Sequence, residues 1–244
     1  MIRDFKIEFL YFKRHGEYSC KNQTEANEKV YSNEEVMTYY MYALLISQVL
    51  WKHHFDIFIY LKRKLPHFIK TEKNVKVLDV GPGHGFYSYI IKNEYPAYDC
   101  LDIIDISRNS LDMTEKMLGE ERRIHYINMD IFYFNSESKY DLIILGEVLE
   151  HLDNPRLILL KLSELLNDDG VLWITAPVNS PAIDHVYLFK SRKEIIDLIE
   201  ESNLQVIESI SFSSEGRMDE ETSNKNKITT VSALFCKKSH EVSN

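Results

Sequence analysis

Apolar and aromatic residues recur at helical spacing through the first 73 residues of the chain. The clearest stripe follows Ser32 and Asn33, either of which can cap a helix, and it ends at Pro66. Its members stand three or four positions apart and so share one helix face: Val36, Tyr40, Leu44, Ser47, Trp51, Phe55, Phe58 and Leu61. The pattern predicts one long helix inside an N-terminal helical cap that comprises residues 1–73.

From residue 74 to residue 238, short apolar runs alternate with amphipathic stretches, which is typical of an α/β domain with a mostly parallel sheet. The apolar runs predict strands at residues 75–80, 100–105, 124–128, 140–145, 171–176, 204–212 and 229–236. The amphipathic stretches predict helices over residues 84–93 and 108–118, from Pro155 onward, and after Ser191. We therefore expect a Rossmann-like, doubly wound sheet of seven strands. Polar residues 213–227 are expected to form a mobile loop, and residues 239–244 a tail.

Charge and cysteine content narrow the class of protein. Lys and Arg number 29 against 38 Asp and Glu, a net charge of −9, which makes a nucleic-acid partner unlikely because phosphate binding relies on basic residues. Cys20, Cys100 and Cys236 are too widely spaced for a metal motif or a disulfide framework. The start of the chain resembles no secretory signal, and no apolar run approaches a membrane span. We expect a cytoplasmic protein with no metal and no membrane partner.

The segment from Asp79 to Gly85 joins the first predicted strand to the following helix. Its glycines allow positive φ and close approach of a ligand to the backbone. The helix N-terminus after them favours an anionic or polar ligand. The spacing is Asp-x-Gly-x-Gly-x-Gly, whereas the GxGxxG dinucleotide motif would need a glycine where Phe86 stands. The loop predicts a ligand site at the end of this strand, but not one of the NAD type.

This spacing resembles the first motif of class I S-adenosylmethionine-dependent methyltransferases, and the resemblance covers residues 74 to about 237. It implies S-adenosylmethionine as the cofactor, with the glycine loop around its methionine end. Asp105, at the end of the second strand, would accept hydrogen bonds from the ribose; Asp102 is the competing acid. Asp130, after the third strand, would bind the adenine amino group unless it only caps a helix. The cofactor residues implied are Asp79, Gly81, Gly83, Gly85, Asp105, Ile106, Asp130, Ile131 and Glu147.

Two segments supply acceptor-site candidates. The run Glu147-Val148-Leu149-Glu150-His151-Leu152 resembles the segment that follows the fourth strand in this family, and we expect Glu147 and His151 to share one face of a short helix. After the fifth strand, His185 is either a general base or a structural pin of the loop, and Asp184 is expected to point away from it. The substrate-binding residues expected are Tyr39, Tyr42, His151, Asn179 and Tyr187.

The function expected from the resemblance is methyl transfer to a nitrogen or oxygen atom of a small metabolite or a peptide natural product. The alternatives are a methyltransferase for RNA or protein, and a non-catalytic S-adenosylmethionine-binding module. An Asn-Pro-Pro-Tyr-like motif, which would indicate base-amine or glutamine methylation, is absent after the fourth strand. The aromatic N-terminal helix could also form a homodimer interface.

Overall fold

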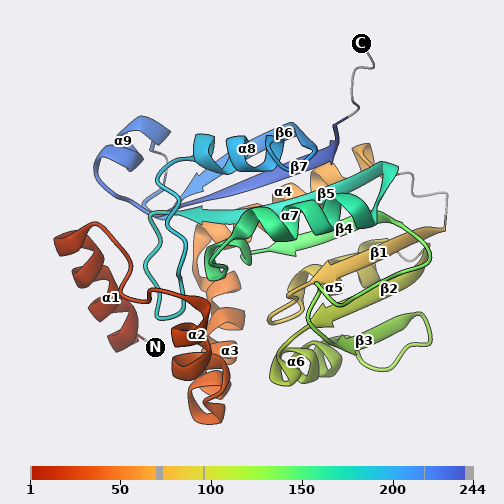
Figure 1. The fold of residues 1–244 in the computed structure, drawn as a ribbon, viewed down its shortest axis with the longest axis horizontal. Helices are drawn as coiled ribbons and strands as arrows, with labels where there is room; N and C mark the ends of the chain where they lie inside the picture. The colour runs from red at the N-terminus through yellow and green to blue at the C-terminus, as the bar shows by residue number, and fades with distance from the viewer. Residues whose placement is uncertain (1, 70–73, 96, 217, 240–244) are drawn as a thin grey trace.

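A computed structural model describes residues 2–69, 74–95, 97–216 and 218–239. In this part of the chain one seven-stranded sheet has the strand order β3-β2-β1-β4-β5-β7-β6 (Figure 1). The strands are β1 (Val75–Val80), β2 (Tyr98–Asp105), β3 (Ile124–Asn128), β4 (Tyr140–Gly146), β5 (Leu166–Val178), β6 (Leu204–Ser213) and β7 (Thr230–Lys238). β1 to β5 pair in parallel, and β7 runs antiparallel to both β5 and β6. The predicted fold class is confirmed.

The central strands are apolar on both faces because helices cover both sides of the sheet. In β1, Val77 points to one face beside Leu101 of β2 and Leu142 of β4, and the next residue, Leu78, points to the other. The chain order reverses at β1, which pairs with β2 on one side and β4 on the other. In doubly wound folds such a reversal places a crevice at the carboxyl ends of the two central strands.

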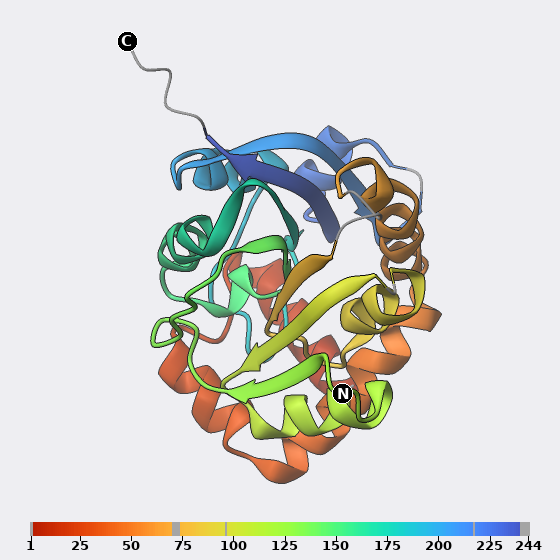
Figure 2. The same ribbon diagram turned by 90° about the vertical axis from the view of Figure 1, so that its right-hand side faces the viewer.

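Two helical layers enclose the sheet (Figure 2). One face packs against α4 (Lys52–Lys64), α5 (Phe86–Glu94) and α6 (Arg108–Leu118). The other face packs against α7 (Pro155–Leu165) and α8 (Arg192–Glu200). Each helix contributes an apolar stripe at helical spacing, as in Ile158, Leu159 and Leu162 of α7, whose side chains are buried.

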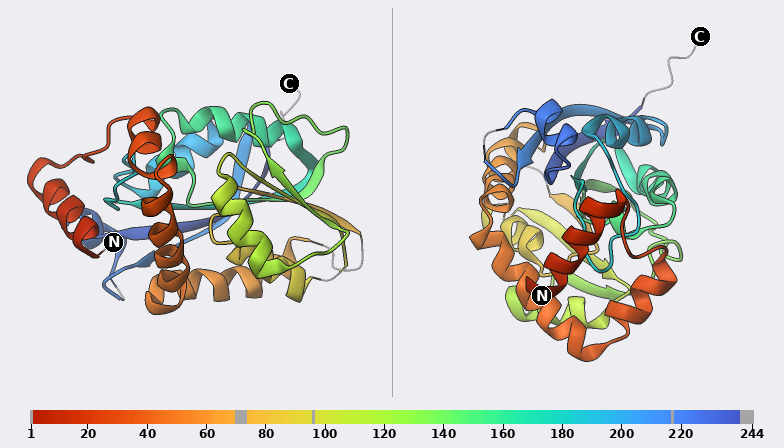
Figure 3. Two further views of the ribbon diagram at one scale, coloured as in Figure 1. Left: turned by 90° about the horizontal axis from the view of Figure 1, so that it is seen from below. Right: turned by 90° about the vertical axis from the view of Figure 1, so that its left-hand side faces the viewer.

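The N-terminal helices lie across the carboxyl ends of the parallel strands (Figures 1 and 3). They are α1 (Ile2–His15), α2 (Gln23–Ala26), the π-helical turn η1 (Asn27–Tyr31) and α3 (Glu34–Leu50). A small core of Val30, Met37, Tyr40 and Met41 holds η1 and α3 together. We call residues 2–50 the cap.

The single long helix predicted between Asn33 and Pro66 is wrong. α3 ends at Leu50 and α4 begins at Lys52, because Trp51 between them has an extended backbone with ψ of 115°. The Ser47 hydroxyl donates a hydrogen bond to the Leu44 carbonyl oxygen 2.7 Å away. Such a side-chain bond to the backbone competes with regular helix structure. The break sends α4 away from the cap and onto the sheet, and it leaves Phe55 half exposed instead of in a stripe.

Residues 213–227 are not wholly a loop. They contain α9 (Glu220–Lys225), which the carboxylate of Asp219 caps by accepting the Thr222 N–H at 2.8 Å. The predicted tail, residues 239–244, lies outside the described residues except for Ser239. Within the described ranges, none of the helices is both long enough and apolar enough to cross a bilayer.

Candidate active site

A cavity of about 1000 Å³ lies between the cap and the carboxyl ends of β1, β2, β4 and β5. This is the upper end of the usual size of a ligand pocket, about 300–1,000 Å³, so the cavity has room for two ligands side by side. One end is lined by the loops after β1, β2 and β3, and the other by the loops after β4 and β5 together with the cap. We call these the glycine-loop end and the polar end.

The glycine-loop end begins where β1 stops at Val80. Gly81 and Gly83 both have positive φ, 67° and 54°, which glycine adopts without strain. A Cβ on Gly81 would lie 2.7 Å from Val148, whereas a Cβ on Gly83 would meet no atom within 4 Å. The loop therefore curves around open space and presents bare backbone to it.

Asp105 ends β2 and lines the same end of the cavity. Its Oδ1 accepts the Ser107 N–H at 2.7 Å, which fixes the carboxylate, and burial raises the pKa of Asp105 to about 6. Asp102 does not line the cavity, since its carboxylate accepts the Tyr140 hydroxyl and pairs with His125. Of the two acids, only Asp105 is placed to bind a ligand there.

Beyond β3 the cavity wall is largely apolar. Ile106, Met129 and Phe132 are exposed large apolar side chains that line it, and buried Ile131 lies among them. Asp130 also lines this wall, with Oδ1 accepting the Phe132 N–H at 2.9 Å. An apolar slot with one carboxylate at its edge suits a flat, amine-bearing ring.

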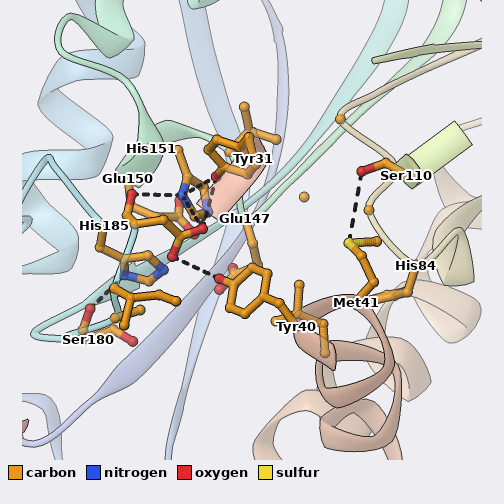
Figure 4. Close-up of a pocket in the computed structure, with 18 of the residues that line it drawn as sticks. Tyr31, Tyr40, Met41, His84, Ser110, Glu147, Glu150, His151, Ser180 and His185 are labelled. Atoms are coloured by element: carbon orange, nitrogen blue, oxygen red, sulfur yellow. Dashed lines mark hydrogen bonds and ion pairs between the residues drawn. The ribbon is translucent and has the colours of Figure 1, made fainter. Parts of the chain in front are cut away.

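At the polar end Tyr31 and Tyr40 of the cap lie near His151 and His185 (Figure 4), and the buried carboxylate of Asp184 joins the cap to the domain. Asp184 Oδ1 accepts the Tyr40 hydroxyl at 2.8 Å, and Oδ2 accepts the Tyr31 hydroxyl at 2.9 Å and lies 3.4 Å from His151 Nδ1. Burial alone would raise the pKa of Asp184, but His151, His185 and the two hydroxyls outweigh it and lower the pKa. The carboxylate thus ties the cap to both loops of the polar end.

His185 lies in the loop after β5, and its ring orientation is fixed. Its Nδ1 lies 2.6 Å from the Ser180 carbonyl oxygen, which can only accept, so Nδ1 carries the proton and Nε2 keeps a free lone pair. The Ser180 N–H in turn donates to the Tyr18 hydroxyl of the cap at 2.9 Å. Burial lowers the pKa of His185 to about 4, so the ring is neutral at neutral pH.

A family model of the methyltransferase domain matches residues 53–209, more than half of the chain. The chain belongs to the class I S-adenosylmethionine-dependent methyltransferases. The predicted family is thereby confirmed, as is S-adenosylmethionine as its cofactor. The residues at the glycine-loop end fit this cofactor: the loop is open at Gly83, and the carboxylate of Asp105 is fixed.

Relatives of this methyltransferase act on different acceptors. Malonyl-[acyl-carrier protein] O-methyltransferase 1 of Ilyobacter polytropus is 30% identical over 108 residues, 44% of this chain and 40% of the relative. (S)-coclaurine N-methyltransferase of Papaver somniferum is 27% identical over 103 residues, 40% of this chain and 28% of the relative. The matches thus span less than half of each relative's length.

Among solved structures, the N-methyltransferase NodS from Bradyrhizobium japonicum WM9, in complex with S-adenosyl-L-homocysteine, has a TM-score of 0.59 and 15% identity. The similarity covers 88% of this chain and 98% of NodS. At this level of identity the likeness concerns the fold alone.

Ten of the predicted site residues line the cavity of the methyltransferase: Tyr39, Gly81, Gly83, Asp105, Ile106, Asp130, Ile131, Glu147, His151 and His185. The structure corrects one detail for two of them. Glu147 and His151 do not share a helix face, because the short 3-10 helix η3 covers only Leu149–His151 and Glu147 precedes it with φ of 54°.

Two residues predicted to bind the cofactor do not line the cavity. Asp79 is 1% exposed, accepts the Ser88 hydroxyl at 2.6 Å, and has its pKa raised to about 7 by burial. Gly85 caps α5 in a left-handed conformation with φ of 77°, where a Cβ would lie 3.0 Å from the Thr114 Cα. Asp79 and Gly85 instead make contacts that shape the loop.

Three predicted substrate-binding residues also lie away from the cavity lining. Tyr42 is 55% exposed on the outside of α3. Asn179 is buried with φ of 52°, and its carbonyl accepts the Thr229 hydroxyl at 2.8 Å. Tyr187 packs on Phe189, with ring centroids 4.7 Å apart. The Asn179 carbonyl and the Tyr187 ring thus hold the loop after β5 in place, whereas Tyr42 lies on the cap.

The structure adds residues that the sequence analysis missed at the polar end. Asp184, which was expected only to point away from His185, is a buried partner of both tyrosines and of His151. Glu150 is also buried, 1% exposed, and it lines the cavity. Charged Glu150 next to apolar Leu149 was a usable signal, because an acid within a buried run needs a partner or a function.

Two alanine substitutions distinguish a glycine that borders the proposed ligand site, Gly83, from one that packs against the protein, Gly85. Gly83→Ala is expected to weaken S-adenosylmethionine binding at least tenfold, because the new methyl group occupies the open space that the ligand needs. Gly85→Ala is expected to lower the melting temperature more than Gly83→Ala does, because its Cβ meets the backbone of α6. Calorimetric titration and thermal melting of both variants test this. Equal losses of affinity with equal melting temperatures would show that the loop acts as one unit.

Proposed function

We propose that this protein transfers the methyl group of S-adenosylmethionine to an oxygen or nitrogen atom of a small metabolite or peptide bound at the polar end. One observation carries the proposal: a single cavity joins the glycine loop and Asp105 to His151 and His185. A cofactor at the first end and an acceptor at the second would lie in one enclosure. Transfer requires this, because the methyl group must lie in line between sulfur and the acceptor atom.

The cofactor supplies the electrophilic methyl group, so the protein's tasks are binding, orientation and the handling of a proton. The free Nε2 of neutral His185 can accept a hydrogen bond or a proton from an acceptor group. Asp105 and the backbone of Gly83 would hold the ribose and methionine parts of the cofactor. Asp130 and Ile131 would hold the adenine.

The cap is proposed to act as a lid over the acceptor. The Tyr31 and Tyr40 hydroxyls bind Asp184, and the Tyr18 hydroxyl binds the loop that holds His185. Lys13 of α1 donates to the carbonyl of Asn226 at 2.6 Å, beyond α9. These contacts make the shape of the polar end depend on the cap.

A homodimer through the cap and a cytoplasmic location are further proposals. The three unpaired cysteines support the cytoplasmic location.

Two measurements test the proposal, and calorimetry is the first. S-adenosylmethionine and S-adenosyl-L-homocysteine are expected to bind with micromolar Kd, and NAD is expected not to bind. Strong NAD binding without a response to S-adenosylmethionine would overturn the assignment of the cavity.

The second measurement is turnover. The protein is incubated with isotopically methyl-labelled S-adenosylmethionine and separate panels of small hydroxy compounds, amines, peptides, intact proteins and short RNAs. Labelled product is expected from the small-molecule or peptide panels. Label only in RNA or in an intact protein would support the alternative acceptor classes, and cofactor binding without product in any panel would support a non-catalytic binding module.

A further inference from the structure

Three potential metal ligands meet at the polar end of the cavity. Glu150 and His151 belong to η3 after β4, and His185 lies in the loop after β5. One ligand atom of each lies within 4.8 Å of the others. The two loops are fixed together, because the carbonyl of Glu150 accepts the N–H groups of Val186 and Tyr187 at 2.8 and 2.9 Å. Backbone hydrogen bonds therefore hold the two loops that carry these three residues side by side.

Both imidazoles are oriented as metal ligands usually are. His185 Nδ1 donates to the Ser180 carbonyl at 2.6 Å, and His151 Nδ1 lies 3.1 Å from the Asp184 carbonyl. Metal-binding histidines commonly donate one ring N–H to a carbonyl or carboxylate and so leave the other nitrogen for the metal. Here Nε2 is the nitrogen left free in both rings. His151 Nε2 is directed toward Glu150, 3.8 Å from its Oε1.

Glu150 is an unsatisfied carboxylate. Its side chain is 1% exposed, and neither Oε1 nor Oε2 has a hydrogen-bond partner. Oε1 of the neighbouring Glu147 has none either. Buried carboxylates normally pair with a cation or coordinate a metal, and these oxygens lack hydrogen-bond partners.

We propose that Glu150, His151 and His185 bind one divalent first-row transition cation, with Glu147 beside it at the edge of the cavity (Figure 4). Two imidazole nitrogens and a carboxylate suit Mn²⁺ or Zn²⁺ more than Mg²⁺ or Ca²⁺, which prefer oxygen ligands. Ligands of one zinc ion lie about 2.0–2.2 Å from it, hence at most about 4.4 Å from one another. Small side-chain rotations bring the three atoms into this range.

The site would act on the acceptor, and this part of the inference rests on the proposed function. Three protein ligands leave coordination positions open toward the cavity, where a hydroxyl oxygen of the acceptor can bind. A cation lowers the pKa of a bound hydroxyl, which then loses its proton to water. The oxygen forms the new bond to the methyl carbon, and the electron pair of the broken carbon–sulfur bond stays on sulfur as S-adenosyl-L-homocysteine. The favoured acceptors are therefore hydroxyl compounds, with methylation at oxygen.

Metal binding can be measured without turnover. The full-length protein is stripped with EDTA, dialysed, and titrated with MnCl₂ or ZnCl₂ by calorimetry, with free Mn²⁺ counted by electron paramagnetic resonance. One cation per chain is expected, with a micromolar or lower Kd. Glu150→Gln and His185→Asn should each weaken binding at least tenfold, while His67→Asn, on the exposed side of the chain, should leave it unchanged. No binding by the wild type, or equal binding by all variants, would overturn the proposal.

A second readout on the wild type covers the case in which a variant fails to fold. Mn²⁺ is expected to broaden the imidazole NMR signals of His151 and His185 before that of His67; uniform broadening of all histidine signals would overturn the site. S-adenosylmethionine binding by the metal-free protein reports on the proposed function separately. Transfer to hydroxyl acceptors should fall after EDTA treatment and return with Mn²⁺. Full transfer in the metal-free protein would overturn the proposed role on the acceptor.

Discussion

Asp105→Ala is expected to weaken S-adenosylmethionine binding by about 1.5–3 kcal/mol, roughly 10- to 150-fold in Kd. A carboxylate that accepts hydrogen bonds from two ribose hydroxyls contributes within this range, because hydrogen bonds to charged groups are the stronger kind. The Ser107 N–H already fixes Asp105 in the free protein, so the carboxylate would lose little freedom on binding. Calorimetric titration with S-adenosylmethionine measures the loss.

Asp102→Ala is the matched control, since Asp102 lies on the same strand but binds Tyr140 and His125 instead of lining the cavity. It should lower the stability of the fold more than the affinity for the cofactor. The reverse order, with Asp102→Ala binding more weakly than Asp105→Ala, would contradict the assignment of the ribose site.

The affinity should also depend on pH in a defined direction. Burial raises the pKa of Asp105 to about 6, and the ionised form is the one that accepts from both hydroxyls. Affinity is therefore expected to be constant above about pH 7 and to fall as the pH drops through 6, at most about tenfold per pH unit. The dependence should be absent in Asp105→Asn.

The sheet was predictable because most of its parallel strands contain an apolar run that a polar residue or a glycine ends or follows. The predicted third strand agrees with β3, and Val80 and Asp105 end β1 and β2 as expected. These strand ends place Gly83 and Asp105 at one edge without further information. That is why the glycine-loop end of the cavity follows from the sequence.

The polar end was less predictable because long-range contacts determine it. Nothing in the sequence near Asp184 shows that Tyr31 and Tyr40, more than 140 positions earlier, will donate to it. The helix break at Trp51 was missed because the apolar spacing continues through it. Asn179 and Tyr187 were predicted to face the substrate from their place after β5, but they are not among the residues that line the cavity.

Glycine spacing is likewise an incomplete guide to ligand contact. Gly81, Gly83 and Gly85 all have positive φ, so the sequence pattern treats them alike. Only the three-dimensional surroundings separate them, because a side chain would meet Val148 at Gly81, Thr114 at Gly85 and empty space at Gly83. The motif therefore predicts the shape of the loop, while the structure shows which of its members borders open space.

His185→Ala is expected to reduce turnover about 100-fold or more and to leave the Kd for S-adenosylmethionine within about twofold. The side chain lies at the polar end, away from the glycine loop, and its Nε2 is held ready by the Ser180 carbonyl. Single-turnover rates with saturating cofactor measure the effect, and His67→Ala serves as the control. An unchanged rate with a lower melting temperature would show that His185 only pins the loop.

The same variant distinguishes two ways in which Nε2 could act. If His185 holds a cation, His185→Ala should lose Mn²⁺ binding and turnover together. Turnover lost with Mn²⁺ binding intact would overturn the metal assignment and make His185 the proton acceptor. Tyr18→Phe is expected to have a smaller effect, since it removes the hydroxyl that accepts the Ser180 N–H but keeps the imidazole of His185. Its turnover should lie between those of the wild type and His185→Ala. The loop that orients Nε2 has lost one hydrogen bond, but the imidazole of His185 is still present.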